Sequence, residues 1–183
     1  MKALAKSNAA LAPSPTIASR LPSIVSVEAE LLRRSLHEFS RASWPVLEPG
    51  TEFVDNWHLE VIDEHLEAVT KGKIRNLIIN MPFRCMKSTK VSVQWPAWEW
   101  TNRPSEQYLT ASHDADLATR DAFKMRMLIE SPWYRQRFGN TVALRHDQNA
   151  KTRYINTKNG HRIVTSVGGS AIGEGGSRRL IDD

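Results

Sequence analysis

The spacing of apolar residues changes near residue 75, and this change limits the kinds of fold open to the chain. Before it, apolar side chains recur at helical spacing, whereas after it short apolar runs alternate with helical stretches. Leu77–Met81 and Gln107–Ala111 are the predicted buried strands. Helices are predicted over about Lys87–Trp100, with a kink or late break at Pro96, and over about Asp114–Glu130. This alternation indicates an α/β domain with a mainly parallel sheet.

The N-terminal part is predicted to be a helical subdomain packed against this sheet. Ser26 is expected to cap a helix that runs to about Ser43, and a second helix, Asp55–Thr70, is expected to stop at Gly72. The first residues are rich in Ala, Ser and Pro and are expected to be disordered, with a secretory signal as the alternative. The predicted division is a lead-in over 1–24, the helical subdomain over 25–73 and a sheet-containing core over 74–183.

Two strand-like stretches near the C-terminal end flank a turn. Arg153–Asn156 and His161–Val167 lie on either side of Lys158–Gly160, whose Asn-Gly pair favours a tight β-hairpin. A glycine-rich stretch, Gly168–Gly176, then leads into Leu180–Asp183. The sequence therefore predicts a hairpin followed by one more strand.

The composition leaves several classes of partner open. The chain has 25 Lys and Arg against 20 Asp and Glu, a net charge of +5, and its basic residues are spread along the sequence. This charge permits a polyanionic partner without requiring one. No apolar run approaches the roughly 20 residues that cross a bilayer, so no membrane association is expected. The single cysteine cannot form a disulfide within the chain, which suits a reducing cytoplasm.

The segment Met81–Thr89 (MPFRCMKST) carries the clearest chemical signal. It follows a predicted strand and opens a predicted helix, the context of a loop whose backbone N–H groups face phosphates. In such a loop Lys87 contacts the β- and γ-phosphates of a nucleotide, and the Ser88 hydroxyl binds Mg²⁺. Compared with the pattern GxxxxGK(S/T), Met81 and Met86 occupy both glycine positions. The alternative is a strand-to-helix turn that carries basic residues.

The stretch Leu180–Asp183 (LIDD) has the form of a Walker B motif, in which two carboxylates follow an apolar strand. Asp182 is expected to hold Mg²⁺ through water, and Asp183 is expected to polarise an attacking water. Because both motifs would serve one Mg²⁺, Lys87 and Asp182 are expected at the same edge of the sheet, with Leu77–Met81 parallel to the LIDD strand. The alternative is a strand that ends in a solvated turn.

Five stretches occur in the order found in one protein family. They are LEPGTEFVDNWHLEVIDEHLEAV, RNLIINMPFRCMKST, SVQWPAWEWTNRPSEQYLTAS, LIESPWYRQRFG and TSVGGSAIGEGG. From roughly Leu36 to Asp183, the chain thereby resembles the large terminase subunit of tailed bacteriophages. The resemblance implies a P-loop ATPase fold of the additional-strand type, followed by an RNase H-like nuclease domain that is expected to be absent here. It also implies that ATP hydrolysis drives translocation of double-stranded DNA into a viral procapsid.

The resemblance assigns roles to individual residues. Arg84 stands where the family's loop often carries an arginine, which would stabilise charge on the γ-phosphate. Trp57 and His58 lie in the region that approaches the adenine in this family, although Trp57 also fits a core position on its helix. Gly168–Gly176 is expected to lie near the nucleotide or a neighbouring subunit, or to be a flexible connector. The implied site comprises catalytic Asp183 and Arg84, Mg²⁺ ligands Ser88 and Asp182, and ATP-binding Arg84, Cys85, Met86, Lys87, Ser88, Thr89, Trp57 and His58.

The sequence departs from the family pattern in both motifs. Met86 replaces the glycine that usually precedes the lysine, at a cost of about 1–3 kcal/mol in backbone strain. Its side chain is also expected to crowd the phosphates. Arg178 and Arg179 stand in the Walker B strand, where burial of unpaired charge is costly.

The resemblance also implies partners, cofactors and a location. The partners are double-stranded DNA, a portal protein and the small terminase subunit, with a homo-oligomeric ring as the assembly. The cofactors are ATP and Mg²⁺, and the location is the cytoplasm of the bacterial host. Because the sequence stops just after the Walker B motif, the alternative is a truncated prophage remnant with weak or no nucleotide binding. Another P-loop motor, such as a helicase, fits the two nucleotide motifs alone.

Overall fold

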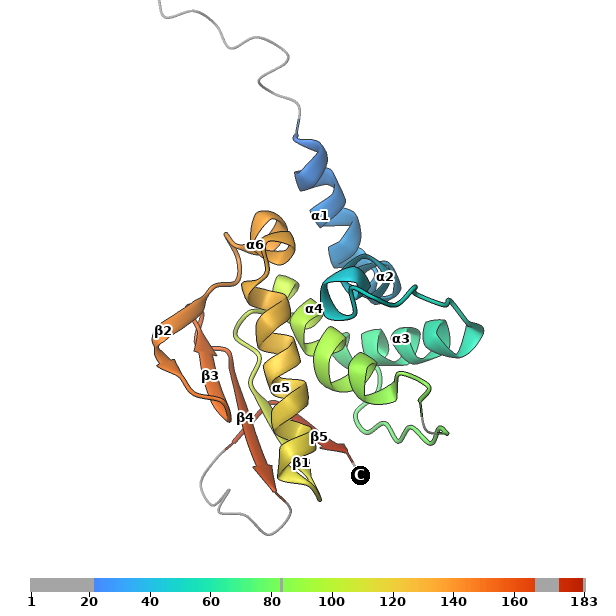
Figure 1. Ribbon diagram of the computed structural model, residues 1–183, viewed down its shortest axis with the longest axis vertical. Helices are drawn as coiled ribbons and strands as arrows, with labels where there is room; N and C mark the ends of the chain where they lie inside the picture. The colour runs from blue at the N-terminus through green and yellow to red at the C-terminus, as the bar shows by residue number, and fades with distance from the viewer. Residues whose placement is uncertain (1–21, 83, 167–174, 183) are drawn as a thin grey trace, which may run out of the picture.

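The computed structural model describes residues 22–82, 84–166 and 175–182. The helices are α1 (Ile24–Arg34), α2 (Leu36–Leu47), α3 (Trp57–Thr70), the π-helical turn η2 (Thr89–Gln94), α4 (Trp95–Asn102), α5 (Ala115–Glu130) and α6 (Pro132–Phe138). The strands are β1 (Tyr108–Ser112), β2 (Leu144–Asn149), β3 (Arg153–Asn156), β4 (His161–Ser166) and β5 (Arg178–Asp182). The chain is thus an α/β protein with N-terminal helices and one sheet (Figure 1).

The sheet is mixed and has five strands in the order β2-β3-β4-β1-β5. β1 is parallel to both β4 and β5, whereas β3 is antiparallel to β2 and β4. The predicted mainly parallel sheet is therefore wrong, because the β3–β4 hairpin and β2 add an antiparallel half. The predicted turn of that hairpin is confirmed, and Asn159 has a φ of 64°. Helix α5 packs against β1 and β4 and crosses the sheet in Figure 1.

The segment Leu77–Met81 is not a strand, so the prediction of a buried strand parallel to the LIDD strand is wrong. Leu77, Ile79 and Met81 pack against the core, whereas Ile78 is 88% exposed. This alternation gives the strand-like pattern without any backbone pairing. Cavities of about 120 and 220 Å³ separate the segment from β5. β5 is therefore an edge strand of the described sheet.

The N-terminal helices differ in their boundaries from the prediction. Ser23, rather than Ser26, caps α1, and its side chain accepts a hydrogen bond from the backbone N–H of Ser26 at 3.1 Å. The single predicted helix is two, because Ser35 is extended and its side chain caps α2 at Glu38. Helix α3 agrees with the second predicted helix, and Gly72 follows it with a φ of 74°.

The helix predicted from Lys87 forms, but it widens into η2 before α4 begins at Trp95. Pro96 lies in the first turn of α4 and has no N–H to offer the Ser92 carbonyl one turn earlier. The buried Arg162 guanidinium on β4 donates a hydrogen bond to that carbonyl. The irregular turn, η2, thus precedes Pro96 and α4 continues through it, while the acceptor that proline leaves free is satisfied from the sheet.

The expected cost of an unpaired Arg178 in the last strand does not arise. Its guanidinium binds the buried Glu99 carboxylate on α4, with Nη2 at 2.6 Å from Oε1 and Nε at 3.1 Å from Oε2. Tyr108 also donates a hydrogen bond to Glu99. These hydrogen bonds raise the pKa of Arg178, and burial raises the pKa of Tyr108 well above 10.0. Arg179 is exposed, so neither arginine is a buried unpaired charge.

Candidate nucleotide-binding site

The structure brings Lys87, Ser88 and Asp182 together at one edge of the sheet. Lys87 Nζ lies 3.2 Å from Asp182 Oδ1, and the Ser88 hydroxyl donates to Asp182 Oδ2 at 2.6 Å. Lys87 and Ser88 open the helix that leads into η2, and Asp182 is the last residue of β5. The Lys87 and Asp182 side chains are 31% and 24% exposed, so a ligand can reach both. The prediction that Lys87 and Asp182 lie at the same edge of the sheet is confirmed.

The loop before Lys87 has the backbone shape that usually calls for glycine. Met86 has a φ of 61° and Arg84 a φ of 64°, both in the left-handed region. A residue with a β-carbon pays about 1–2 kcal/mol to adopt this conformation. The sequence-based argument that Met86 is strained is therefore confirmed. Arg84 is exposed, and Thr89 is the first residue of η2.

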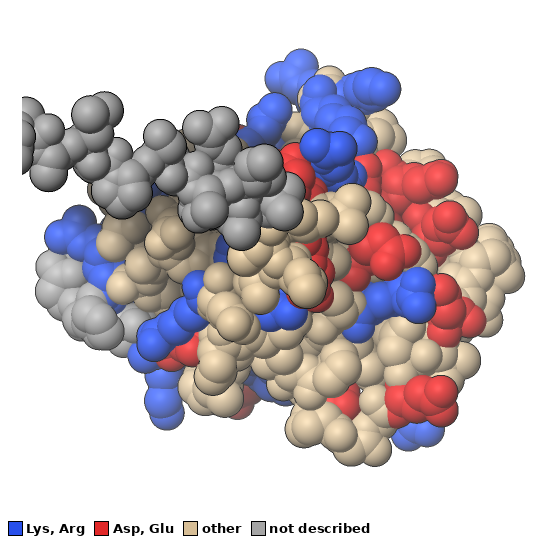
Figure 2. All heavy atoms as spheres, turned by 90° about the horizontal axis from the view of Figure 1, so that it is seen from above, with Lys and Arg blue, Asp and Glu red and all other residues tan. Residues whose placement is uncertain are grey.

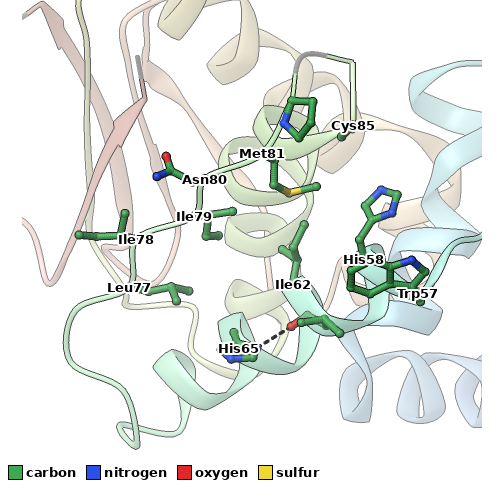
Figure 3. Close-up of a pocket in the computed structure, with 12 residues that line it drawn as sticks. Trp57, His58, Ile62, His65, Leu77, Ile78, Ile79, Asn80, Met81 and Cys85 are labelled. Atoms are coloured by element: carbon green, nitrogen blue, oxygen red, sulfur yellow. Dashed lines mark hydrogen bonds between the residues drawn. The ribbon is translucent and has the colours of Figure 1, made fainter.

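An apolar groove of about 530 Å³ opens beside the loop (Figure 3). Its walls come from α3 and from the segment that precedes Lys87. They are Trp57, His58, Val61, Ile62, His65, Leu77, Ile78, Ile79, Asn80, Met81, Pro82 and Cys85. Trp57 and His58 thus face the same groove as Cys85 of the loop. Trp57 is 75% exposed, so the alternative of a core position on its helix is wrong.

Two predicted parts of the site lie outside the described residues. Asp183, the expected catalytic carboxylate, is one of them, and most of the glycine-rich stretch Gly168–Gly176 is the other. Among the residues that are described, no three His, Cys, Asp or Glu side chains are grouped so that they could hold a metal. A metal at Asp182 would therefore need hydroxyl and water ligands as well.

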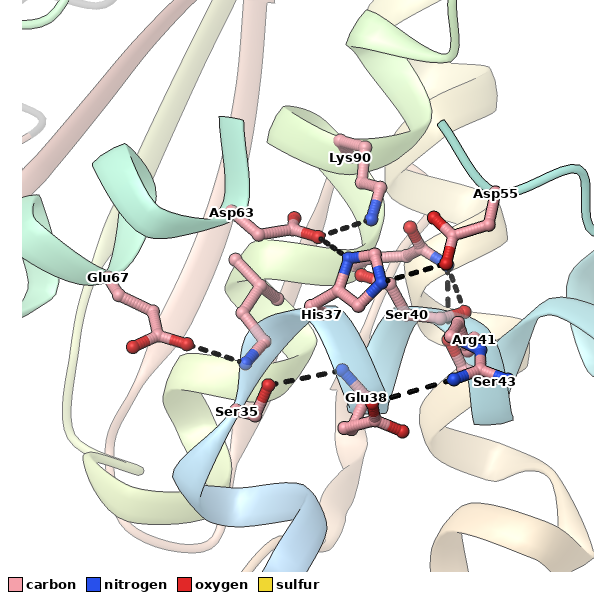
Figure 4. Close-up of polar contacts among 12 residues, drawn as sticks. Ser35, His37, Glu38, Ser40, Arg41, Ser43, Asp55, Asp63, Glu67 and Lys90 are labelled. Atoms are coloured by element: carbon pink, nitrogen blue, oxygen red, sulfur yellow. Dashed lines mark hydrogen bonds and ion pairs between the residues drawn. The ribbon is translucent and has the colours of Figure 1, made fainter. Parts of the chain in front are cut away.

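A buried charged cluster joins the helical part to η2, and the sequence argument missed it (Figure 4). The fully buried Lys90 Nζ lies 2.6 Å from Asp63 Oδ2 on α3. His37 Nδ1 lies 3.1 Å from the same oxygen, and His37 Nε2 lies 3.2 Å from Asp55 Oδ2. Burial raises the pKa of Asp63 and lowers the pKa of Lys90, and in each case the partner's charge opposes the shift. One signal was present, because Asp63 interrupts the apolar stripe of α3.

The charged side chains are unevenly distributed over the surface. On the face shown in Figure 2, acidic residues gather along one flank, and basic residues lie in separate groups. This face has no continuous basic band among its coloured residues. Within the described residues, no helix has the length and apolar character needed to cross a membrane.

The fold and the site define an α/β protein in which a helix-opening Lys-Ser pair meets an aspartate at the end of a parallel strand. Comparison with known proteins adds no relative: no protein-family model, no curated protein and no solved structure matches the chain.

Proposed function

We propose that the chain binds ATP with Mg²⁺ at Lys87, Ser88 and Asp182 and is the ATPase part of a DNA-packaging motor of the large-terminase type. The observation that carries the nucleotide proposal is the meeting of these three side chains across 94 residues of sequence. The two motifs were identified separately in the sequence, and a chance pair would have no reason to converge. The P-loop fold is part of this proposal.

The donor set at this edge suits Mg²⁺. A serine hydroxyl and a carboxylate are hard oxygen ligands, and Mg²⁺ typically takes one or two carboxylates together with water and phosphate oxygens. The hydrogen bond from Ser88 Oγ to Asp182 Oδ2 places both oxygens within reach of one small ion. When bound, Mg²⁺ would neutralise charge on the phosphates. Lys87 would leave its ion pair with Asp182 and bind the phosphates instead.

The groove beside the loop suits an adenine ring. Purines bind by stacking on aromatic side chains, and the exposed Trp57 offers such a face. His58 lies edge-on to it, with ring centroids 6.0 Å apart. Cys85 lines the groove and belongs to the loop, so a base in the groove and phosphates at Lys87 are compatible with one ligand.

The proposed motor activity rests on the sequence resemblance. It requires double-stranded DNA as the translocated partner, a portal protein and the small terminase subunit, and a homo-oligomeric ring. The separate basic groups of Figure 2 favour a DNA track assembled from several subunits over a continuous band on that face. A neighbouring subunit in the ring would contribute the remaining charge.

A second candidate function is a remnant that binds nucleotide weakly or not at all, and Met86 favours it. A methionine in the left-handed region carries a side chain where the family's loop presents glycine hydrogen to the phosphates. The Lys87–Asp182 ion pair also has to open before phosphate can bind. Both effects lower affinity without changing the site's location.

A titration with a fluorescent ATP analogue tests the proposal. We expect saturable, Mg²⁺-dependent binding that Lys87→Ala weakens roughly 10- to 100-fold, because a charge-assisted hydrogen bond contributes about 1.5–3 kcal/mol. The control is Lys73→Ala, which removes an exposed lysine before the groove segment and should leave the affinity unchanged. An equal loss of affinity in both variants, or binding that EDTA does not weaken, would contradict the assignment. No binding by the wild-type chain would favour the remnant.

A further inference from the structure

A small polar cavity is lined by Ser88 and Asp182 and shares no lining residue with the apolar groove. Its volume is about 50 Å³, and β1, α5 and η2 supply most of its walls. The residues that line it are Ser88, Ser92, Thr110, Ser112, Leu117, Ala118, Arg120, Asp121 and Asp182. Six of these side chains, including Ser92, carry hydroxyl or carboxylate oxygens, so this cavity is chemically unlike the apolar groove.

Thr110 is the clearest sign that the cavity takes a ligand. Its side chain is 1% exposed, and its hydroxyl has no hydrogen-bond partner within the described protein. A buried hydroxyl without a partner costs about 1–3 kcal/mol. Ser112, two residues further along β1, lies on the same face and is 3% exposed. A cavity of this size holds one or two water molecules, which would satisfy Thr110.

Asp121 adds a second carboxylate to the cavity that Asp182 lines. It lies on α5 and is 5% exposed, and its Oδ1 accepts hydrogen bonds from the Arg120 guanidinium at 3.0 Å. Arg120 itself is 55% exposed, so this ion pair is open to solvent on one side. Asp121 is thus a nearly buried carboxylate that is paired with Arg120 and lines the same cavity as Asp182 and the buried Thr110 and Ser112 hydroxyls.

We propose that Thr110, Ser112 and Asp121 hold water molecules of the hydration shell of the Mg²⁺ ion that Ser88 and Asp182 bind. Mg²⁺ loses its water reluctantly and usually keeps several water ligands, so its site needs oxygen groups one water away. Asp121 is then a positioning residue, which orients the ion through water without touching the nucleotide. This inference rests on the proposed function of Ser88 and Asp182.

The test is Mn²⁺ binding followed by electron paramagnetic resonance, with Mn²⁺ in place of Mg²⁺ and ADP present at a saturating concentration. The variants are Asp121→Asn and Thr110→Val, which keep the shape of each side chain. The matched control is Asp116→Asn, an exposed aspartate in the first turn of the same helix. Asp182→Asn reports on the proposed site itself. The free energy of unfolding of every variant is measured in urea.

We expect Asp121→Asn to weaken Mn²⁺ binding roughly tenfold, as is usual for groups that act through metal-bound water, and Asp116→Asn to leave it unchanged. Thr110→Val should weaken Mn²⁺ binding about fivefold. It should not lower the free energy of unfolding, because the hydroxyl that it replaces with a methyl group has no hydrogen-bond partner among the described residues. A merely structural role predicts the reverse for Thr110→Val, with lower stability and unchanged Mn²⁺ affinity.

Three results would overturn the inference, and they identify which part fails. If Asp182→Asn abolishes Mn²⁺ binding while Asp121→Asn and Thr110→Val bind like wild type, the water-shell assignment is wrong and the proposed function survives. If Asp116→Asn weakens binding as much as Asp121→Asn, only the general negative charge of α5 matters. If the wild-type chain binds neither ADP nor Mn²⁺, the proposed function fails and this inference fails with it.

Discussion

Replacement of Asp63 by asparagine tests how the N-terminal helices are fastened to the helix that follows the loop. Lys90 is fully buried on η2, and its Nζ lies 2.6 Å from Asp63 Oδ2. Asparagine keeps the size of the side chain but removes the negative charge, so the Lys90 ammonium stays buried without its nearest counter-ion. Loss of one partner of a buried ion pair typically costs about 3–5 kcal/mol. Since domains are stable by about 5–15 kcal/mol, the variant should be severely destabilised at pH 7.

A second substitution separates charge from packing. In Asp63→Asn combined with Lys90→Met, no unpaired charge is buried, so the double variant should be more stable than Asp63→Asn alone. The assay is urea unfolding followed by tryptophan fluorescence. The control is Glu64→Gln, which neutralises the exposed carboxylate beside Asp63 on α3 and should change stability by less than about 0.5 kcal/mol.

The pH dependence gives an independent check with a defined sign. Burial lowers the pKa of Lys90 below 10.5, and Asp63 opposes this shift. Without Asp63 the pKa of Lys90 in the folded chain falls further. At pH values between this lowered pKa and 10.5, the unfolded chain therefore binds more protons than the folded chain. Stability therefore rises with pH in this interval. The difference in unfolding free energy between wild type and Asp63→Asn should therefore become smaller from pH 7 to pH 10. A difference that stays constant with pH, or that is below about 0.5 kcal/mol at every pH, would refute the reasoning.

Three further substitutions give predictions at other positions. Met86→Gly should raise the free energy of unfolding in urea by about 1 kcal/mol, because it relieves the strain of a φ of 61°. It should also tighten binding of a fluorescent ATP analogue, because the methionine side chain no longer crowds the phosphates. Equal affinities would contradict the crowding argument. Trp57→Ala should leave stability within about 0.5 kcal/mol, since the side chain is 75% exposed, but weaken the same binding by about 1–3 kcal/mol. Arg178→Met should cost about 2–3 kcal/mol in the same unfolding assay, because it leaves the Glu99 carboxylate buried without its cation; an unchanged midpoint would mean that Tyr108 alone satisfies it.

Features with a local cause were predictable from the sequence. Asp114 caps α5 through the backbone N–H of Asp116, as a helix-capping residue does anywhere. Asn159, with a φ of 64°, and the Asn156 side chain, which accepts hydrogen bonds from the Lys158 and Gly160 N–H groups, set the turn between β3 and β4 locally. The meeting of Lys87 with Asp182 was also predicted, from the expectation that both side chains serve one Mg²⁺ ion.

Features that depend on distant partners were not predictable. β2 has one strongly apolar residue, Leu144, and forms because β3 offers an edge to pair with. Leu77–Met81 has a strand's pattern but no partner within pairing distance. Arg178 is satisfied by Glu99, 79 residues away, and Lys90 by Asp63, 27 residues away. In each case a short window of sequence does not contain the group that decides the outcome.

The most direct measurement of the central claim is the anomalous scattering of Mn²⁺ in crystals grown with a non-hydrolysable ATP analogue. The account predicts one strong peak within about 2.2 Å of Ser88 Oγ, next to the Asp182 carboxylate, with Lys87 turned from Asp182 to the phosphates. A peak elsewhere, or a bound analogue that leaves the Lys87–Asp182 ion pair of 3.2 Å intact, would contradict it.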